Sequence, residues 1–468
     1  MIIIRIQCIQ ISAYFDCINR PKALIDAAIS LGLSGIAITD HECLSAHMEV
    51  NQYAKKLKET NPDFTIALGN EIYLTDDRTS GQKYYHFLLI AKDEIGYKAL
   101  KKLSSTAWIN SYSDRNMERV PTLKSELATI MSNYKGHVIA TTACLGGELS
   151  TNALQMTLAR NVGDAKTAEQ HYLKIKDFVN YCIEVFGKED FYLECAPAAS
   201  EDQILVNKTL INIAKAYGLK MSIGSDSHYL RPEDRTVHKA YLNSKDGDRE
   251  VDSFYEYTYL MSPEEVIEVL KKSYTEDEID WIMQCTLAIK EKIKFFSLER
   301  KQIIPKVEVF DYPQFDCETD FTGKYNPEWT FSTIDELLCS DNIQERYWIN
   351  ECLKSLKEKE LYNTTYLNRI EIEADIIKHI GNQLDDCLFA YFNTFKHYID
   401  LFWDCGSIVG PGRGSATGFL SNYLLGITQL DPIRWGLPYW RFLNKERAEL
   451  PSLLLILGSC KKRTLTVA

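Results

Sequence analysis

The first half of the chain alternates short apolar runs with longer amphipathic segments. Short apolar runs bounded by polar residues predict strands, and apolar residues spaced three and four apart predict helices. Strands are predicted over residues 1–16, 34–39, 64–68, 85–91, 137–142, 191–194 and 220–224, with helices over 21–31, 45–57, 94–134, 164–186 and 202–217. A repeated strand–helix unit is typical of α/β barrels, whose strands form the core and whose loops hold the site.

The second half is mostly helical in pattern and contains one glycine-rich stretch. Scattered prolines and weak periodicity between two helical regions predict a linker. We therefore expect a barrel over 1–235, a helical extension over 236–296, a linker over 297–335, a helical segment over 336–400 and a last segment over 401–468.

The glycine-rich stretch reads Val409-Gly-Pro-Gly-Arg-Gly-Ser-Ala-Thr-Gly418. Glycines allow backbone N–H groups to turn toward an anion, because no Cβ blocks the approach. A helix is predicted over 416–425, and a loop that leads into a helix N-terminus can hold a phosphate, with Arg413 adding a positive charge. A plain turn between two core elements is the alternative that local composition leaves open.

Polar side chains able to bind metal occur mostly at the ends of the predicted strands. Imidazole, thiolate and carboxylate groups form a ligand set suited to Zn, Mn or Fe. A single such histidine is more often a buried core residue, but this many spread over five strands are harder to explain as core filling. The candidate metal ligands are His41, Glu71, His86, Cys144, Asp226 and His228.

Composition and charge limit the classes of partner. The chain has 468 residues, 25% of them charged, and a net charge of -12, so its surface as a whole does not attract nucleic acid and any DNA contact needs a local basic patch. The 13 cysteines are scattered without a Cys-x-x-Cys pair, and no signal peptide or membrane-spanning run is present. This predicts free thiols and a cytoplasmic protein that does not enter a membrane.

The glycine-rich stretch and the residues that follow it form a series of short motifs: GPGRGS at 410–415, Ile427-Thr428, Asp431-Pro432, Gly436-Leu437, Arg441-Phe442-Leu443-Asn444 and Glu446-Arg447. In this order they closely resemble the start of the palm in the C-family replicative polymerases, the family of the bacterial DNA polymerase III alpha subunit. The resemblance implies that Gly412, Arg413, Gly414 and Ser415 bind the triphosphate of an incoming dNTP. It also implies Mg as a cofactor, and primer–template DNA and other replisome subunits as partners.

The first half resembles the PHP (polymerase and histidinol phosphatase) domain that begins the same polymerases. His41 lies in an ITDH motif, Glu71 in a GxExY motif and Cys144 in an ACLxGE pattern. Asp226 and His228 lie in an (N/S)DxHY motif. The resemblance implies an α/β fold, a distorted (β/α)7 barrel followed by a polymerase-beta-like palm. It adds Asp16 to the metal ligands and implies that the site could hydrolyse phosphodiesters, including 3′–5′ removal of nucleotides.

The chain departs from the family pattern at two places. The family's first two metal-binding histidines would fall at Gln7 and Ile9, and its catalytic aspartate pair would fall near Ser452 and Leu454. Two-metal phosphoryl transfer needs paired carboxylates, and residues 452–457 contain none. We expect an early stop or a reading-frame slip near residue 452, and a chain that retains no catalytic residues for polymerisation.

The sequence therefore predicts a polypeptide of the DNA polymerase III alpha family, a family of template-dependent nucleotidyltransferases, in an incomplete form without synthesis. Two alternatives stay open. One is a stand-alone PHP-type metal-dependent phosphoesterase or 3′–5′ exonuclease, and the other is a non-catalytic replisome scaffold. The motifs at 410–447 favour the polymerase family over a lone phosphoesterase, and the missing histidine and aspartate pairs favour the scaffold.

Overall fold

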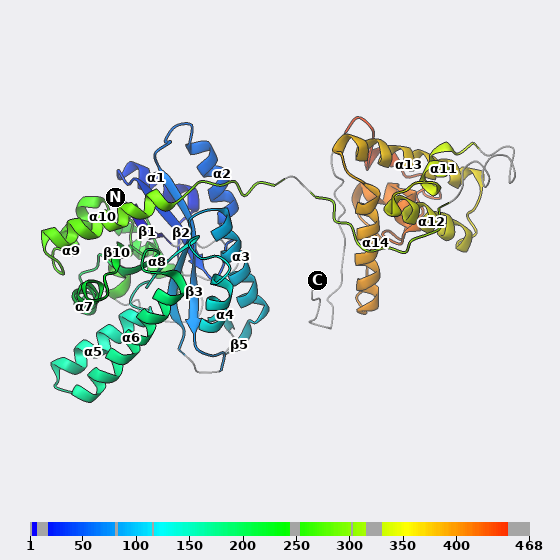
Figure 1. Ribbon diagram of the computed structural model, residues 1–468. Helices are drawn as coiled ribbons and strands as arrows, with labels where there is room; N and C mark the ends of the chain where they lie inside the picture. The colour runs from blue at the N-terminus through cyan, green and yellow to red at the C-terminus, as the bar shows by residue number, and fades with distance from the viewer. Residues whose placement is uncertain are drawn as a thin grey trace. The chain divides into compact units, whose positions relative to one another are not determined.

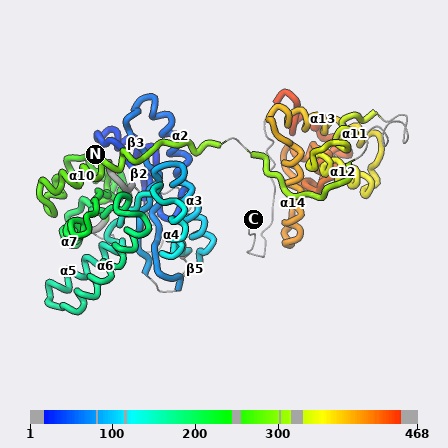
Figure 2. Tube along the Cα trace, in the orientation of Figure 1, coloured from blue at the N-terminus to red at the C-terminus, as the bar shows by residue number. Residues whose placement is uncertain are grey.

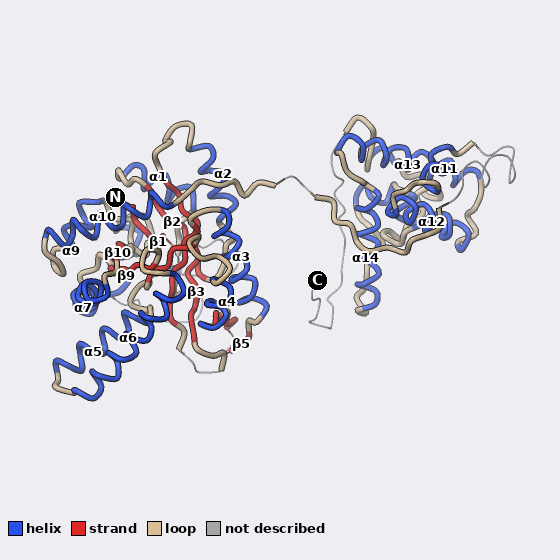
Figure 3. Tube along the Cα trace, viewed as in Figure 1, coloured by secondary structure: helices blue, strands red, loops and turns tan. Residues whose placement is uncertain are grey.

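The computed structural model describes residues 2–6, 17–79, 83–114, 117–243, 253–300, 303–314 and 330–447 (Figure 1). The chain divides into two compact units, Met1–Arg300 and Lys301–Ala468. The first unit contains strands and helices, whereas the described part of the second consists of helices and loops (Figure 3). The finer division into five segments stays a prediction.

The first unit is built on one eight-stranded sheet. Seven strands follow the order β1-β2-β3-β4-β8-β9-β10, and β7 (Pro121–Leu123) pairs with β3 off this path. Every pairing along the path is parallel except the two made by β4, which is antiparallel to both neighbours. The end strands β1 and β10 approach each other, so the sheet curls toward a barrel, which confirms the predicted fold. The path strands are β1 (Ile2–Ile6), β2 (Gly35–His41), β3 (Thr65–Thr75), β4 (Tyr85–Ala91), β8 (Val138–Thr141), β9 (Phe191–Cys195) and β10 (Lys220–Ile223).

Alternating side chains of the sheet enter two different cores. On β2, Ile36 and Ile38 join the main core with the surrounding helices, whereas Ala37 joins a smaller inner cluster. Successive residues of a strand point to opposite faces, so the inner cluster marks the inner face of the curled sheet. Ile289 of α10 (Glu276–Lys292) completes this cluster. The inner cluster comprises Ala37, Ala67, Leu88, Ile90, Ile139, Ala143, Tyr192 and Ile289.

Most predicted helices of this unit are confirmed, and residues 94–134 are the main correction. The expected single helix is broken by β5 (Tyr112–Asp114), β6 (Met117–Arg119) and β7. Pro121 lacks the N–H that a helix interior needs, and it begins a short strand instead. An unpredicted helix, α5, packs beside α6 as a hairpin (Figure 2). The helices are α1 (Pro21–Ser30), α2 (His47–Leu57), α3 (Glu94–Ile109), α4 (Lys124–Met131), α5 (Glu148–Asn161), α6 (Ala165–Phe186), α7 (Glu201–Tyr217), α8 (Arg235–Leu242), α9 (Pro263–Leu270) and α10.

The second unit is a helical assembly around an aromatic core. Trp348, Phe389, Phe392 and Phe419 are almost fully buried in this core. Part of the predicted linker packs onto it, since Ile304 is buried there. The helices are α11 (Ser332–Leu338), α12 (Ile343–Glu358), α13 (Thr364–Leu384), α14 (Phe389–Asp404) and α15 (Leu420–Leu424).

Two further expectations from composition can be compared with the structure. Within the described ranges, no helix combines the length and the apolar character needed to cross a lipid bilayer. Nine described cysteines are free thiols, as expected, whereas Cys339 is disulfide-bonded and departs from that expectation.

Candidate metal centre and nucleotide loop

The strand register brings three predicted metal ligands onto one face of the sheet. His41 at the end of β2 lies opposite Glu71 of β3, and Tyr73 of β3 lies opposite His86 of β4. Directly opposed residues share a face, and so do residues two apart on one strand. His41, Glu71 and His86 therefore share the face that carries Ala37 and Ala67, so these ligands lie on the inner face of the curled sheet.

The antiparallel direction of β4 explains why a histidine at the start of a strand joins the site. His41 is the last residue of β2, whereas His86 is the second residue of β4. Because β4 runs against β3, its beginning lies at the sheet edge where β2 ends. The rule that site residues follow the strands of a barrel holds for His41 and fails for His86.

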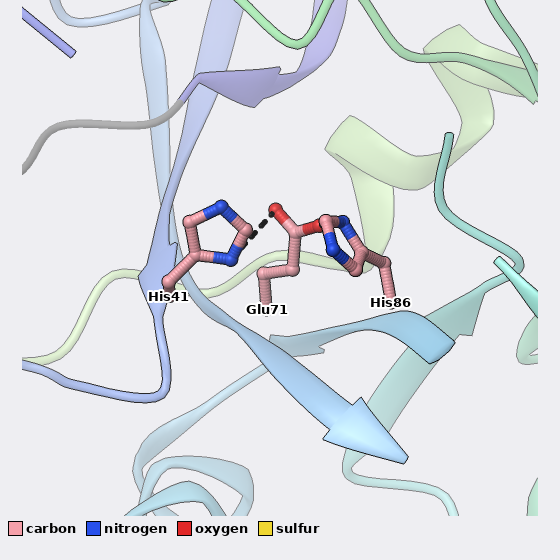
Figure 4. Close-up of side chains that lie close together, drawn as sticks. All are labelled: His41, Glu71 and His86. Carbon is pink, nitrogen blue, oxygen red and sulfur yellow. Dashed lines mark ion pairs between the residues drawn. The ribbon is translucent and has the colours of Figure 1, made fainter. Parts of the chain in front are cut away.

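The three side chains converge closely enough to bind one ion. One ligand atom from each of His41, Glu71 and His86 lies within 4.8 Å of the other two. Glu71 Oε2 is 3.8 Å from His41 Nδ1, and Glu71 Oε1 is 2.7 Å from His86 Nδ1 (Figure 4). The side chains of Glu71 and His41 are buried, and that of His86 is 29% exposed. Two imidazoles and a carboxylate fit a divalent transition metal, and His86 is where the site meets solvent.

Cys144 adjoins this group through His86. Its Sγ lies 3.6 Å from His86 Nδ1 and accepts a hydrogen bond from the Gly146 N–H at 3.4 Å. The backbone N–H of His86 donates a hydrogen bond to the Gly146 carbonyl, so the loop after β8 is fixed against the start of β4. A Cβ at Gly146 would meet the His86 ring at 3.2 Å, so a bulkier residue there would press on the imidazole. The structure therefore places Cys144 beside the three-residue group.

Two opposing effects act on the pKa of His86. Burial lowers its pKa, but the nearby Cys144 and Glu71 raise it by charge attraction and hydrogen bonding, and the net result is a pKa well above the usual value. These two neighbours thus favour the protonated form of the imidazole. A metal ion would replace that proton, because a ligating histidine must be neutral.

Asp226 and His228 form a second buried pair, in the loop after β10. His228 Nδ1 lies 2.7 Å from the Asp226 carbonyl oxygen and 3.9 Å from Asp226 Oδ1. Neither residue belongs to the three-residue group among the described residues. The predicted ligand Asp16, and Gln7 and Ile9, lie outside the described residues.

Three loops around the barrel site have strained backbone. Glu42, Ala143 and Asp226 have φ values of 49°, 56° and 47°, in the left-handed region that disfavours residues with a Cβ. Glu42 follows His41, Ala143 precedes Cys144, and Asp226 is itself a candidate ligand. Strain of this kind costs about 1–3 kcal/mol per residue and is often found at functional sites.

Sequence reasoning missed Glu42. Its side chain is almost completely buried, and burial is the main reason that its pKa rises to about 8. One carboxylate oxygen accepts a hydrogen bond from the Tyr73 N–H, and the Glu42 carbonyl accepts one from Trp108 Nε1 at 2.8 Å. A glutamate after an Asp-His pair reads as an ordinary loop residue, so no signal in the sequence would have identified it.

The glycine-rich loop is exposed where phosphate would bind. Arg413 and Gly414 are exposed, and Gly412 and Ser415 are partly exposed. Gly412 and Gly414 have φ values of 113° and 68°, which glycine adopts without strain. The helix predicted over 416–425 is instead a 3₁₀ turn, Gly414–Gly418, followed by the five-residue α15. At the break, Gly418 packs against Pro438, and a Cβ at Gly418 would lie 2.5 Å from the Pro438 carbonyl oxygen, so only glycine fits there. Ser452 and Leu454 lie outside the described residues.

Two family models match the chain. Residues 11–198 match the PHP domain, and residues 336–454 match the bacterial DNA polymerase III alpha NTPase domain. The first match covers every strand from β2 to β9, and the second covers the glycine-rich loop and the helices before it. The two resemblances inferred from motifs are therefore confirmed.

Relatives of known name cover nearly the whole chain. The "Probable DNA polymerase YorL" of Bacillus subtilis (strain 168) and the "DNA-directed DNA polymerase" of Bacillus phage SPbeta are each 40% identical over 461 residues. Each alignment covers 94% of this chain and 35% of the relative. The "DNA polymerase III subunit alpha" of Campylobacter jejuni is 29% identical, with 94% of this chain and 34% of the relative covered. The chain spans about a third of the length of the curated relatives it matches. The chain therefore combines a PHP domain with a region of the bacterial DNA polymerase III alpha NTPase domain, and over 94% of its length it is similar to bacterial and phage DNA polymerases.

Proposed function

We propose that this chain is a polypeptide of a DNA-directed DNA polymerase and that residues 412–415 bind the triphosphate of a dNTP. The observation that carries the proposal is the geometry of the loop. Gly412 and Gly414 adopt positive φ on either side of the exposed Arg413, so backbone and guanidinium groups can face one anion. Arginine suits this position because its planar group binds phosphate oxygens in pairs.

Nucleotide binding and nucleotide transfer make different demands. Binding needs the loop and its cation, whereas transfer also needs carboxylates that hold Mg ions on the attacking and leaving oxygens. Residues 452–457 read Ser-Leu-Leu-Leu-Ile-Leu and contain no carboxylate. This chain should therefore bind dNTPs weakly and not incorporate them.

Photochemical crosslinking tests where the nucleotide binds. A photoreactive dATP analogue should label the peptide that contains residues 410–418, and excess unlabelled dATP should suppress the labelling. Labelling that stays spread over both units, or that dATP does not suppress, would reject the loop as the binding site.

A second candidate function rests on the group His41, Glu71 and His86. We infer that it binds Zn, Mn or Fe, with Cys144 as a neighbouring ligand and with Asp16, Asp226 and His228 as further candidates. A bound ion would supply Lewis-acid activation of a phosphate ester or of water. The residues of this chain would hold it: Glu71 between the two imidazoles, and Cys144 against His86. This observation favours a metal-dependent phosphoesterase or 3′–5′ exonuclease as the alternative activity.

The remaining proposals follow from the similarity to DNA polymerases. We propose primer–template DNA, dNTPs and other replisome subunits as partners, and the cytoplasm as the location. The five-segment division, with a PHP barrel over 1–235 and a palm segment over 401–468, belongs to the same proposal. A non-catalytic scaffold role would be supported by binding to replisome proteins that does not depend on metal or nucleotide.

A further inference from the structure

One face of α13 makes hydrogen bonds to Gly418, at the end of the glycine-rich stretch, and to residues that follow it. Tyr366, Arg369 and Glu373 are spaced three and four residues apart along this helix, so their side chains lie in one row. Each makes a hydrogen bond to a residue between Gly418 and Asp431, and Arg369 also reaches Leu437. None of the three was among the site residues predicted from the sequence.

Glu373 fixes the start of α15. Its carboxylate is fully buried and accepts hydrogen bonds from the backbone N–H groups of Leu420 at 2.7 Å and Ser421 at 2.9 Å. These amides belong to the first turn of α15, immediately after the 3₁₀ turn that carries Gly414 and Ser415. A buried carboxylate bound to two amides sets the direction of the chain there, because losing it would leave both donors unsatisfied.

Arg369 links the loop to the segment that follows it. Its Nη2 donates to the carbonyl of Gly418 at 3.1 Å and to the carbonyl of Leu437 at 2.9 Å, and its Nε donates to Glu373 Oε1 at 3.0 Å. The guanidinium group also lies 4.9 Å from the centre of the Tyr439 ring. One side chain thus joins the end of the loop, the 437–439 segment and the buried carboxylate.

Tyr366 extends the same row to the Asp-Pro motif. Its hydroxyl donates to Asp431 Oδ2 at 2.7 Å. Asp431 Oδ1 in turn accepts hydrogen bonds from the N–H groups of Ile433 and Arg434. The Asp431 carboxylate therefore links Tyr366 of α13 to the backbone at residues 433 and 434.

We propose that Tyr366, Arg369 and Glu373 are positioning residues that hold the 412–415 loop in its phosphate-binding shape. This inference rests on the proposed nucleotide site. A loop that is already ordered loses less entropy when it binds a ligand, so removal of the row should weaken binding without removing any group that touches the nucleotide. Because the row acts on the phosphate loop, dATP and inorganic tripolyphosphate should be affected equally.

The same helix provides a matched control. Glu371 also accepts hydrogen bonds from two backbone N–H groups, those of Thr333 at 2.7 Å and Ile334 at 2.9 Å. These amides begin α11, which is a different element from the loop. Glu371→Gln and Glu373→Gln therefore remove the same kind of contact from the same helix, and only the second acts on the loop.

The test measures nucleotide affinity and amide exchange in the full chain. With Mg present, Glu373→Gln and Arg369→Lys should weaken binding of both dATP and tripolyphosphate by roughly tenfold, while Glu371→Gln should leave both affinities within about twofold. Hydrogen exchange should accelerate at Leu420 and Ser421 in Glu373→Gln, and at Thr333 and Ile334 in Glu371→Gln. Only variants that are folded by circular dichroism at the assay temperature are compared.

The outcomes separate this inference from the proposed function. Equal affinity losses in Glu373→Gln and Glu371→Gln would overturn the positioning role, because general destabilisation would explain both. If the parent chain binds neither ligand, the proposed nucleotide site falls and the inferred role in binding falls with it. In that case, hydrogen exchange in Glu373→Gln still tests the contact between Glu373 and the amides of Leu420 and Ser421. Unchanged exchange at these two amides would reject that contact, whereas faster exchange would retain it as a purely structural one.

Discussion

His86 Nδ1 lies 2.7 Å from Oε1 of Glu71, so a buried carboxylate on β3 is joined to a histidine on the antiparallel strand β4. The contact depends on the reversed direction of β4, which brings the beginning of that strand to the end of β2. A fully parallel barrel would place residue 86 at the opposite edge of the sheet. The reversed strand is therefore what completes the candidate metal site.

Metal binding should depend on this pair. In chelator-treated protein, added Zn, Mn or Fe should raise the melting temperature of the first unit, because an ion that binds only the folded state stabilises it. His86→Ala and Glu71→Gln should each remove most of that rise, and metal analysis should show less bound ion. His228→Ala tests whether the second pair contributes, and we expect a smaller loss from it.

His137 provides the control for metal binding. Its Nδ1 lies 2.8 Å from Asp93 Oδ2, so it is also a histidine paired with a carboxylate, but it is outside the three-residue group. His137→Ala should leave the metal-induced rise in melting temperature unchanged. An equal loss in His137→Ala and His86→Ala, or no rise in the parent protein, would contradict the assignment of the site.

The stability of the first unit should fall in mild acid because of His47. This residue is fully buried, and burial lowers its pKa from 6.5 to about 4. The unfolded chain therefore takes up a proton between pH 6.5 and 4 that the folded chain resists, so this contribution to stability is lost as the pH falls through that window. His47 should lower the free energy of unfolding by about 2 kcal/mol between pH 7 and pH 5.

Urea unfolding of metal-free protein at the two pH values measures this effect. His47→Gln cannot take up the proton, so the difference in unfolding free energy between pH 7 and pH 5 should shrink by about that amount. The same pH dependence in the variant and the parent would show that His47 does not carry it.

Exonuclease activity should be weak or absent. The family resemblance puts metal-binding histidines where this chain has Gln7 and Ile9, and neither side chain replaces an imidazole as a transition-metal ligand. Gln7→His combined with Ile9→His should raise 3′–5′ cleavage of single-stranded DNA in the presence of Mn or Zn. Strong cleavage by the parent chain that Asp226→Ala abolishes would show that the first strand is wrongly aligned with the family pattern.

This chain should not extend a primer. Residues 452–457 lack the carboxylates that hold the catalytic metal ions, whatever the affinity of the loop for dNTPs. Placing aspartates at 452 and 454 should not by itself restore synthesis, because catalysis also needs the primer terminus held in line with the nucleotide. Template-dependent extension by protein purified free of host polymerase would contradict this prediction.

The barrel was predictable because its signals are local. Apolar runs identified the strands, and short motifs identified His41 and Glu71. His86 was among the predicted ligands, but the antiparallel direction of β4 that brings it beside Glu71 was not predictable, since the run at 85–91 reads the same in either direction. The loop at 412–415 was recognisable from its glycines together with the family motifs that follow it, but its support was not. Arg369 and Glu373 look like an ordinary helical ion pair until the structure shows which carbonyls and amides they bind.

Calorimetric titration of dATP into the parent chain, Arg413→Ala and Arg434→Ala tests the central claim most directly. Both arginines are exposed in the second unit, but only Arg413 lies between the two positive-φ glycines. The account predicts weak, saturable, Mg-dependent binding to the parent chain and to Arg434→Ala, and at least about tenfold weaker binding to Arg413→Ala. Equal binding to all three proteins, or none to the parent, would contradict a nucleotide site at this loop.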